Sequence, residues 1–423
     1  MITVIDSIMG SGKTTFIVKY INEKYSVAPH RSFDDETLER PKFIYVAPLL
    51  SEVERILEAC PSLRFREPVP VDRRKLNHLE ALIEGGRNIC TTHSLFKLLT
   101  KEICHKLIDQ GYILIIDETL ECVSLYDDLS KNDKDMLLRE RMIYVDESTK
   151  LVCWNNDLHK NYKGKFEHVR HLCENGNLTM SKQNAIVWTF PTEFIKAFDD
   201  VFILTYLFSG SLMASYLEAE GLTVEMTTLN EHQELVAFGG SAMEVGTKAK
   251  LRELITVYDG GMNKHGDKVG KSNPFSSGWL GKQNDTALLS IKGSTEHFFK
   301  SVAKTPANEN AWTTFSKAKK ALKGDRYSRG FIPCNAKATN DYRTKRSLAY
   351  LCNVFHQPPI MSYFREREIE VDQDAFALSE MVQWIWRSQI RDGKPIVVFI
   401  PSNRMRTLFL AWLNEQPRTA LAA

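Results

Sequence analysis

The chain has 423 residues, 43% of them hydrophobic, and a formal net charge of +2. Because domains usually contain ~100–200 residues, this length favours two globular domains, and the near-neutral charge permits a nucleic-acid partner without requiring one. The eight cysteines are scattered singly, without a C-x-x-C pair, which argues against a zinc site or a disulfide framework and favours a reducing cytoplasm.

The first elements in chain order are a strand at residues 2–6 and the segment Ser7-Ile8-Met9-Gly10-Ser11-Gly12-Lys13-Thr14, followed by a helix. This order is typical of a phosphate-binding loop, in which backbone N–H groups and a helix N-terminus face an anion. We expect Lys13 to reach the β- and γ-phosphates and Thr14 to bind Mg²⁺. The predicted nucleotide-binding residues are Ser7, Gly10, Ser11, Gly12, Lys13, Thr14 and Thr15. A strand this early also argues against a signal peptide.

Short apolar runs alternate with longer amphipathic segments through the first half of the chain. The predicted buried strands are residues 43–48, 88–92, 112–117 and 201–206. Alternation of this kind predicts a parallel sheet covered by helices. Residues 121–200, which include a strand-like piece at 142–145, interrupt the pattern and are interpreted as an insertion.

The pattern begins again after Gly221 and predicts a second α/β unit. Its candidate strands are residues 223–229, 287–291, 331–335 and 396–400, and residues 258–285 are expected to form an exposed loop. The chain is thus divided into domain 1 at 1–222 and domain 2 at 223–423. A predicted helix carries Lys317, Lys319, Lys320 and Lys323, for which a solvated face is preferred over a nucleic-acid contact.

The longest uncharged run, residues 201–217, contains three serines and a glycine and is shorter than the ~20 apolar residues of a membrane span. It is interpreted as a buried strand and the next helix. No membrane association is therefore expected, and a cytoplasmic location is predicted.

The predicted strand at residues 112–117 ends in the acidic pair Asp117-Glu118. A buried strand can deliver Asp117 to the Mg²⁺ shell and Glu118 to the γ-phosphate, where it would orient and deprotonate the attacking water. Together with the N-terminal loop, this pair predicts a site that hydrolyses a nucleoside triphosphate with Mg²⁺.

Asp117-Glu118-Thr119-Leu120 resembles the signature of the DEAD-like (superfamily 2) helicases, whose first motif also tolerates a small residue at the place of Ser7. Residues 43–55 and 88–93 resemble the next two family elements. The resemblance implies that Ser51 and Thr92 contact the nucleic-acid backbone and that Thr205 couples hydrolysis to domain movement.

In the second half, Gln383-Trp384-Ile385-Trp386-Arg387-Ser388-Gln389-Ile390-Arg391 resembles the helicase pattern Gln-x-x-Gly-Arg-x-x-Arg, with Arg391 one residue late. If helical, it places Gln383, Arg387 and Arg391 on one face. The resemblance implies that these residues act at the γ-phosphate. Residues 335–342 resemble a further motif, through which Thr339 and Asn340 would contact nucleic acid.

These motifs, with residues 401–406, make the chain similar to helicase-type proteins of tailed bacteriophages. The resemblance implies two tandem RecA-like P-loop domains with parallel sheets and an ATP-dependent helicase or translocase in phage replication or recombination. DNA is preferred over RNA as the partner, and other phage replication proteins are further candidate partners. The location would be the bacterial host cytoplasm.

Two alternatives stay open. A DNA-packaging motor of the terminase type shares the loop and the acidic pair, and needs in addition a nuclease site of clustered acids. No such cluster stands out after residue 223, although Asp372 and Asp374 keep this alternative open. A P-loop loader or switch would bind nucleotide without motor activity.

Overall fold

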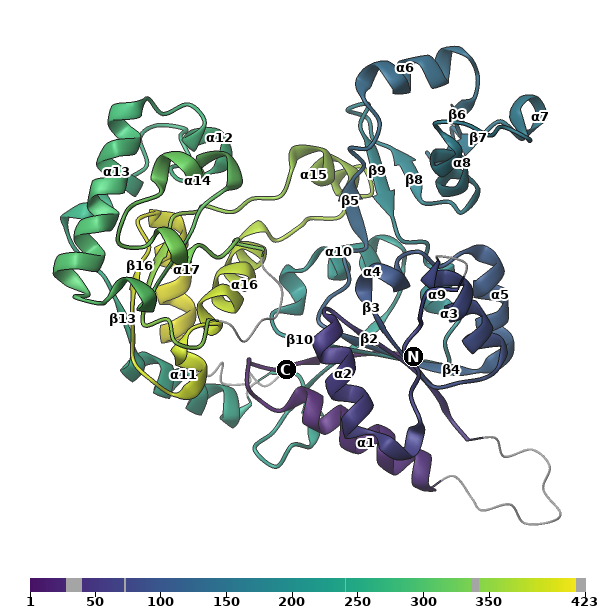
Figure 1. Cartoon of the computed structure of the whole chain (residues 1–423), viewed down its shortest axis with the longest axis horizontal. Coiled ribbons are helices and arrows are strands. Elements are labelled where there is room, and N and C mark those ends of the chain that lie inside the picture. Colours follow the sequence, from purple (N-terminus) through teal and green to yellow (C-terminus); the bar gives the residue numbers. More distant parts are fainter. Residues whose placement is uncertain (28–39, 72–73, 240, 336–341, 416–423) are drawn as a thin grey trace. The chain divides into compact units, whose positions relative to one another are not determined.

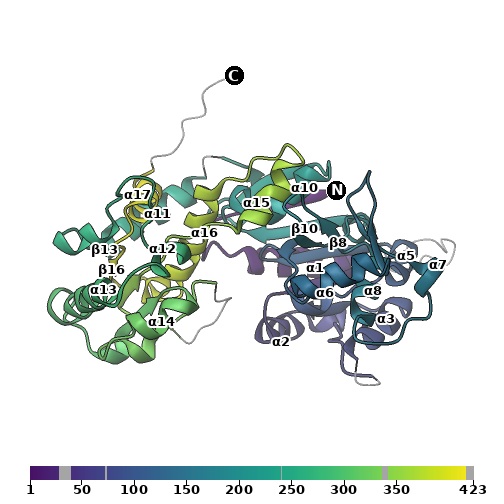
Figure 2. The same ribbon diagram turned by 90° about the horizontal axis from the view of Figure 1, so that it is seen from above.

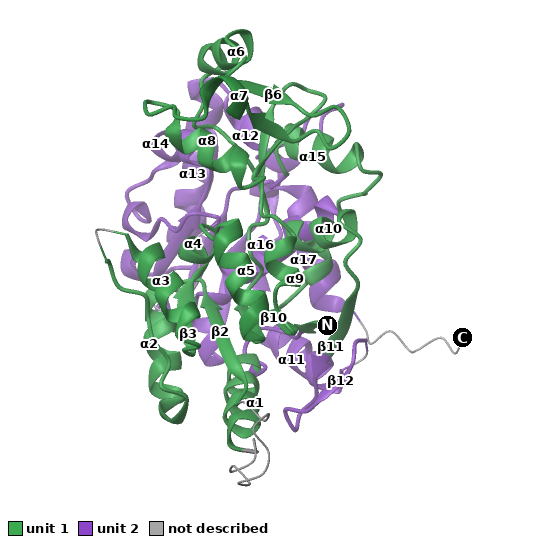
Figure 3. Cartoon of the chain, turned by 90° about the vertical axis from the view of Figure 1, so that its right-hand side faces the viewer, with its two compact units in different colours: residues 1–5, 13–227, 356–371 green, residues 6–12, 228–355, 372–423 purple. Residues whose placement is uncertain are grey.

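The computed structural model describes residues 1–27, 40–71, 74–239, 241–335 and 342–415. Two compact units are distinguished by their internal contacts (Figure 3). Unit 1 comprises residues 1–5, 13–227 and 356–371, and unit 2 comprises residues 6–12, 228–355 and 372–423. The domain limits expected from the sequence stay predictions, because sets of contacting residues do not test independent folding.

In the described part of the chain, the larger sheet has seven strands. Figure 1 shows the helices that surround it. In spatial order the strands are β12 (Leu235–Ala237), β11 (Val224–Leu229), β1 (Ile2–Asp6), β10 (Asp200–Thr205), β4 (Tyr112–Asp117), β2 (Lys42–Ala47) and β3 (Ile89–Thr92). Apolar side chains on both faces explain the central strands: every residue of β1 is buried, as are the first five residues of β4. Pairing is parallel between β1 and β11, β10 and β4, β4 and β2, and β2 and β3.

Helices between these strands provide the covering layers. Their bounds are α1 (Lys13–Val27), α2 (Leu50–Ala59), η1 (Pro61–Leu63), α3 (Lys75–Glu84), α4 (His93–Phe96), α5 (Lys101–Gln110), α9 (Glu193–Lys196), η2 (Phe208–Gly210) and α10 (Leu212–Ala219). A later segment, residues 356–371, also belongs to unit 1 and contributes α15 (Pro358–Arg365). This helix packs on α10, β5 (Val123–Leu125) and β9 (Ile186–Thr189). Ile360 and Phe364 of α15 are part of the apolar core of unit 1.

The segment predicted as an insertion folds into small antiparallel sheets and short helices. One sheet has the order β5 (Val123–Leu125), β9 (Ile186–Thr189) and β8 (Leu178–Met180), and the other pairs β6 (Ile143–Val145) with β7 (Val152–Trp154). The helices are α6 (Lys131–Arg139), α7 (Asn156–His159) and α8 (Glu167–Glu174). Antiparallel pairing separates this segment from the parallel sheet on either side of it in sequence.

Unit 2 has its own four-stranded parallel sheet. The order is β13 (Ile255–Val257), β16 (Ile396–Phe399), β15 (Ser347–Tyr350) and β14 (Asn310–Thr313). The helices are α11 (Ala242–Leu254), η3 (Gly261–Gly266), α12 (Ser277–Leu280), α13 (Asp285–His297), η4 (Phe298–Val302), η5 (Ala307–Glu309), α14 (Ser316–Leu322), η6 (Ser328–Gly330), α16 (Gln373–Trp386), η7 (Gln389–Asp392) and α17 (Asn403–Asn414). Aromatic residues such as Phe298, Trp312 and Tyr327 fill one side of this sheet.

The predicted fold class is confirmed: the chain is α/β with two parallel sheets and an insertion in the first. Three strand predictions differ from the structure. Residues 223–229 do form a strand, but it pairs with β1 instead of opening the second sheet. Residues 287–291 lie in helix α13, because the Asn284 side chain accepts the Ala287 N–H and caps a helix there.

The third difference is at residues 331–335, which make an isolated bridge instead of a strand. Phe331 bridges Trp312, and the Ile332 N–H donates to the Trp312 carbonyl over 3.0 Å. Pro333 follows and has no N–H group to extend the pairing. The loop predicted at residues 258–285 contains two short helices, η3 and α12.

Candidate nucleotide-binding site

The first strand, β1, runs into a turn at residues 7–12, and α1 follows at once. Gly10 and Gly12 have φ angles of +80° and +87°, in the left-handed region that favours glycine. The Ser11 N–H donates to the Ile8 carbonyl over 3.2 Å and closes the turn. A turn of this kind before a helix is suited to binding an anion.

Residues at the start of α1 fit a phosphate ligand. Its first turn contains Lys13, Thr14 and Thr15 and no acidic residue, and the first N–H groups of a helix have no partner within the helix. The Ser11 Oγ atom is buried and has no hydrogen-bond partner among the described residues. Because a buried hydroxyl without a partner is costly, a bound phosphate oxygen would stabilise this turn.

Ser7 holds the turn to the neighbouring strand. It is 1% exposed, and its Oγ lies 2.8 Å from the Thr228 hydroxyl and accepts the Leu229 N–H over 2.9 Å. Its position in the phosphate-binding pattern usually holds a glycine. The serine therefore joins the turn to β11, a role that the sequence alone did not suggest.

Asp117 ends β4 with a carboxylate that has few compensating partners. The Tyr45 hydroxyl donates to Asp117 Oδ2 over 2.8 Å. Burial raises the pKa of Asp117; the Tyr45 hydrogen bond and the charges of Arg55 and Lys13 oppose this rise, whereas Glu52 adds to it. A divalent cation beside the carboxylate would favour its ionised form, so Asp117 fits a Mg²⁺ ligand.

Glu118 follows in an unusual backbone conformation. Its φ angle is +63°, which is uncommon for a residue other than glycine and costs of the order of 1–3 kcal/mol. Its N–H donates to the Leu204 carbonyl over 2.8 Å, so that β10 holds the bend at the end of β4. Strain of this kind is typical of functional positions.

Three neighbouring strands bring the predicted residues to one edge of the sheet. β10 lies between β1 and β4 and runs parallel to β4. The Val201 N–H donates to the Met1 carbonyl at the beginnings of β10 and β1, so these strands also run the same way. The carboxyl ends of β1, β10 and β4 therefore share an edge, where ligands bind in α/β sheets. Thr205, the predicted coupling residue, ends β10 and is 5% exposed.

The predicted nucleic-acid contacts have mixed surroundings. Ser51 is exposed in the first turn of α2, whereas the Thr92 hydroxyl accepts the Leu95 N–H and caps α4. The next residue, His93, is buried, and its Nε2 lies 2.8 Å from the Asp117 carbonyl oxygen. Thr339 and Asn340 lie outside the described residues.

The prediction that Gln383, Arg387 and Arg391 share one helical face is wrong for Arg391. α16 ends at Trp386 with Arg387 as its C-cap, and Arg391 lies in η7. The break occurs at Ser388, whose hydroxyl donates to the Ile385 carbonyl and accepts the Ile390 N–H. Arg387, which is 8% exposed, therefore keeps its predicted spacing from Gln383, whereas Arg391 does not share their face.

Two side chains that sequence reasoning missed contact the turn within unit 2. A Cβ atom on Gly10 would lie 2.8 Å from Trp386 Cζ2, and a Cβ atom on Gly12 would lie 2.8 Å from Gln233 Nε2. The Trp386 ring leaves no room for a Cβ atom on Gly10, whereas the end of the Gln233 side chain can move away from Gly12. The positive φ angles favour glycine at both positions. The first contact brings the residue before Arg387 against the turn.

Gln233 is presented by a tight turn between β11 and β12. The Asn230 Oδ1 atom accepts the N–H groups of His232 and Glu234, each over 2.9 Å. Asparagine commonly stabilises turns in this way. In the sequence, Asn230 between two strand-like runs could have indicated this turn. It does not indicate which glycine the turn approaches.

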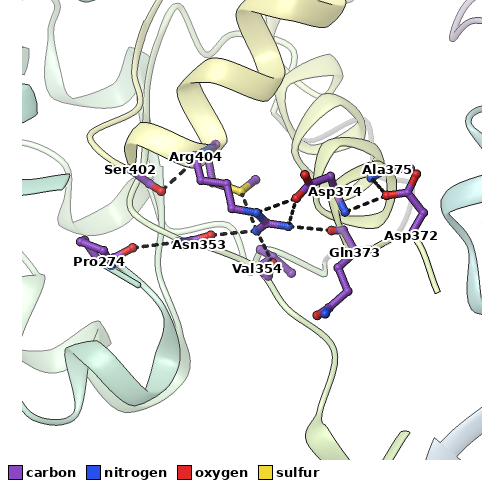
Figure 4. A network of polar contacts seen from close by, with 10 residues as sticks. Pro274, Asn353, Val354, Asp372, Gln373, Asp374, Ala375, Ser402 and Arg404 are labelled. Atoms are coloured by element: carbon purple, nitrogen blue, oxygen red, sulfur yellow. Dashed lines mark hydrogen bonds and ion pairs between the residues drawn. The ribbon is translucent and has the colours of Figure 1, made fainter. Parts of the chain in front are cut away.

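The acids proposed for a nuclease site have structural partners (Figure 4). Asp372 accepts the N–H groups of Asp374 and Ala375 and caps α16. Asp374 forms an ion pair with Arg404 over 2.6 Å, and Arg404 also donates to the Asn353 side chain over 2.9 Å. No group of three or more His, Cys, Asp or Glu residues suited to a metal occurs in the described part of the chain. These contacts give no support to the packaging-motor alternative.

The fold and this geometry define an α/β protein with a phosphate-loop type of turn and an acidic strand end. The chain belongs to the YonV family. It is 36% identical over 427 residues to the SPbeta prophage-derived uncharacterized protein YonV of Bacillus subtilis (strain 168), with 98% of this chain and 99% of that protein covered. The YonV middle domain matches residues 123–188, and the YonV C-terminal Rossmann-like domain matches residues 249–413.

Solved structures show only distant similarity to this chain. Xpd4 of S. tokodaii is 12% identical, with a TM-score of 0.46 and coverage of 96% of this chain and 93% of that chain. The Hef helicase domain of Pyrococcus furiosus is 9% identical, with a TM-score of 0.30 and coverage of 97% and 94%. Such TM-scores do not establish a shared fold. Among the described residues, no helix is long and apolar enough to cross a bilayer.

Proposed function

We propose that this chain is an ATP-dependent nucleic-acid helicase or translocase that acts in the cytoplasm of a bacterial host, in phage replication or recombination. The observation that supports this most strongly is the environment of Asp117. Its half-buried carboxylate, with Lys13 among the charges that act on it, ends a strand at the sheet edge to which β1 delivers the turn. A triphosphate site needs both a phosphate-binding turn and a carboxylate near the metal ion.

The hydrolytic step follows from the chemistry of these side chains. Lys13 binds the β- and γ-phosphates, and Glu118 orients the attacking water and accepts its proton. Thr14 and Asp117 would hold Mg²⁺, which would neutralise charge on the phosphates. The backbone bend at Glu118 sets the direction in which its side chain leaves the backbone. The end of β4 would then provide both the Mg²⁺ ligand, Asp117, and the general base, Glu118.

Arg387 is proposed to stabilise the charge that develops on the γ-phosphate, with Gln383 one helical turn earlier on the same helix. The contact between Trp386 and Gly10 supports this role, because it places the end of α16 against the turn. An arginine in this position can contribute ~10³-fold or more to the rate. Thr205 is proposed to couple ATP hydrolysis to domain movement.

Nucleic acid is the proposed partner, DNA in preference to RNA. Ser51, Thr92, Thr339 and Asn340 are the proposed backbone contacts, which would make binding insensitive to sequence and sensitive to salt. The prophage origin of the YonV relative supports a role in phage DNA metabolism. Other phage replication proteins are proposed as further partners.

ATP turnover with Mg²⁺, measured with no nucleic acid and with single-stranded DNA, duplex DNA or RNA, tests this proposal. We expect single-stranded DNA to stimulate turnover several-fold. Tight ATP binding without stimulation by any nucleic acid would support a loader or switch instead. Cleavage of plasmid DNA with Mg²⁺ or Mn²⁺ would support the packaging-motor alternative.

A further inference from the structure

A short segment of unit 2 concentrates positive charge in a chain whose total is nearly neutral. Residues 316–329 contain six basic residues and one acid, Asp325, whereas the whole chain has a net charge of +2. We call the six residues the basic patch: Lys317, Lys319, Lys320, Lys323, Arg326 and Arg329.

The fold holds the basic patch on the surface. α14 follows β14 directly and packs on α13 and α12, and the three helices lie together in both views (Figure 1, Figure 2). Ala318 and Leu322 of α14 are buried in the aromatic core of unit 2, which fixes the apolar side of the helix. The side chains of the basic patch are all exposed. Lys317, Lys319 and Lys320 lie on α14, and the other three residues lie in the segment that follows it. Exposed charge on an anchored segment is a preformed surface, so that binding a ligand would cost little ordering.

None of the six cations forms an ion pair with a carboxylate among the described residues. Elsewhere in the chain, exposed or half-buried cations such as Lys106, Lys165 and Arg343 have acidic partners within 2.5–2.8 Å. Among the described residues, Lys319 is the one member of the patch with a ring contact, at 4.0 Å over Phe331. The nearby acids include Asp325 and Glu296, and the Asp325 N–H donates to Glu296. Glu309 ends η5, which packs on η6, the helix that contains Arg329.

Unpaired like charges on one short segment repel each other, and a polyanion relieves that repulsion. A lipid surface fits less well, because residues 316–329 expose no large apolar side chain that could insert among acyl chains. Lysine and arginine side chains on an open surface contact phosphates without reading bases. We propose that the basic patch binds the phosphate backbone of nucleic acid. This inference rests on the proposed function for the class of partner.

The test compares two triple variants with the same loss of charge. Lys317→Gln, Lys320→Gln and Lys323→Gln remove half of the basic patch. Lys250→Gln, Arg252→Gln and Lys394→Gln remove three exposed cations elsewhere in unit 2. Circular dichroism establishes that both variants are folded. Fluorescence anisotropy then measures binding of a labelled single-stranded DNA over a range of salt concentrations, without nucleotide.

Each phosphate contact contributes about 0.7 to the slope of log K against log salt concentration for a single strand. The patch variant is expected to lose about 2 from this slope and to bind at least tenfold more weakly at low salt, whereas the control variant keeps the wild-type slope. Equal slopes and affinities in the three proteins would overturn the assignment. So would loss of binding to phosphatidylserine vesicles, or to an acidic protein, with DNA binding unchanged. Because ATP is absent, a chain without ATPase activity leaves this test intact.

Discussion

The Tyr45 hydroxyl donates a hydrogen bond to Asp117 Oδ2 over 2.8 Å, from a strand next to the one that Asp117 ends. This bond lowers the pKa of a carboxyl group that burial raises. Tyr45 itself is fully buried, and burial followed by the Asp117 charge raises the pKa of its phenol. The tyrosine therefore stays neutral and remains a donor while Asp117 is ionised.

Replacement of Tyr45 by Phe is expected to move the acid side of the pH–rate profile for ATP hydrolysis to higher pH. The loss of the donor raises the pKa of Asp117 further, so that its carboxyl group becomes protonated, and unable to bind Mg²⁺, at a higher pH than in the wild type. The profile of kcat/KM against pH measures this shift. An acid limb at the same pH in both proteins would mean that Asp117 does not titrate with activity.

Asp117→Asn is expected to stabilise the apo chain while it abolishes hydrolysis. Since burial raises the folded-state pKa of Asp117 above its unfolded value, the ionised carboxylate disfavours the folded state at neutral pH, and stability increases as the pH falls through the folded pKa. The neutral amide removes this cost. Thermal unfolding without Mg²⁺ at pH 7 and pH 5 should show a higher Tm for the variant at pH 7 and a smaller difference at pH 5. A lower Tm for the variant at both values would contradict the assignment.

Ser7→Ala is expected to lower the free energy of unfolding by about 1–3 kcal/mol, because the buried Leu229 N–H loses its acceptor. Urea unfolding measures the change. Ser301→Ala, at an exposed position, is the control and should change stability by less than about 0.5 kcal/mol. Equal stabilities for the two variants would show that the Ser7 hydroxyl does not fasten the turn.

Gly12→Ala is expected to weaken ATP binding by at least about tenfold, since the added Cβ meets Gln233 and the φ angle of +87° is strained for alanine. Gly246→Ala is the matched control, because this helical glycine has open space around it. Adding Gln233→Ala relieves the contact but not the backbone strain, so the double variant should recover only part of the affinity. Full recovery would assign the whole defect to Gln233.

Arg387→Ala is expected to lower kcat about 10²-fold or more while nucleotide affinity changes little, whereas Arg391→Ala should have a much smaller effect because Arg391 lies beyond the helix end. Arg387→Lys keeps a cation at this buried position and is the control for a folding defect. Isothermal titration with a non-hydrolysable ATP analogue separates binding from turnover. The assignment fails if Arg387→Ala abolishes nucleotide binding or if Arg391→Ala has the larger effect on kcat.

Local sequence patterns predicted the elements that depend on local physics. Four consecutive apolar residues before Asp117 predicted β4 correctly, and the glycines at 10 and 12 predicted the turn before α1. The pattern was misleading at residues 287–291, because a short apolar run can also occur in a helix, where only some of its residues are buried. Here Ile291 is buried while Leu289 is 62% exposed. A cap at Asn284, and not hydrophobicity, decides between strand and helix there.

Contacts between residues far apart in sequence could not be predicted in this way. Tyr45 is 72 residues from Asp117, and the atoms nearest to Gly10 and Gly12 come from Trp386 and Gln233. Periodicity assigns such side chains to a core or a surface but does not say what they contact. The end of α16 at Trp386 could not be predicted either. It depends on the hydrogen bonds of Ser388, whereas the arginine spacing predicts a helix that continues to residue 391.

ATP hydrolysis stimulated by single-stranded DNA, measured in matched pairs of variants, tests the central claim most directly. Glu118→Gln is compared with Glu121→Gln, a surface residue three positions on, and Lys13→Ala is compared with Lys19→Ala on the same helix. We predict that Glu118→Gln and Lys13→Ala each lose at least about 10²-fold in stimulated turnover and remain folded, whereas both controls keep wild-type rates. Wild-type turnover in Glu118→Gln or Lys13→Ala would contradict the account.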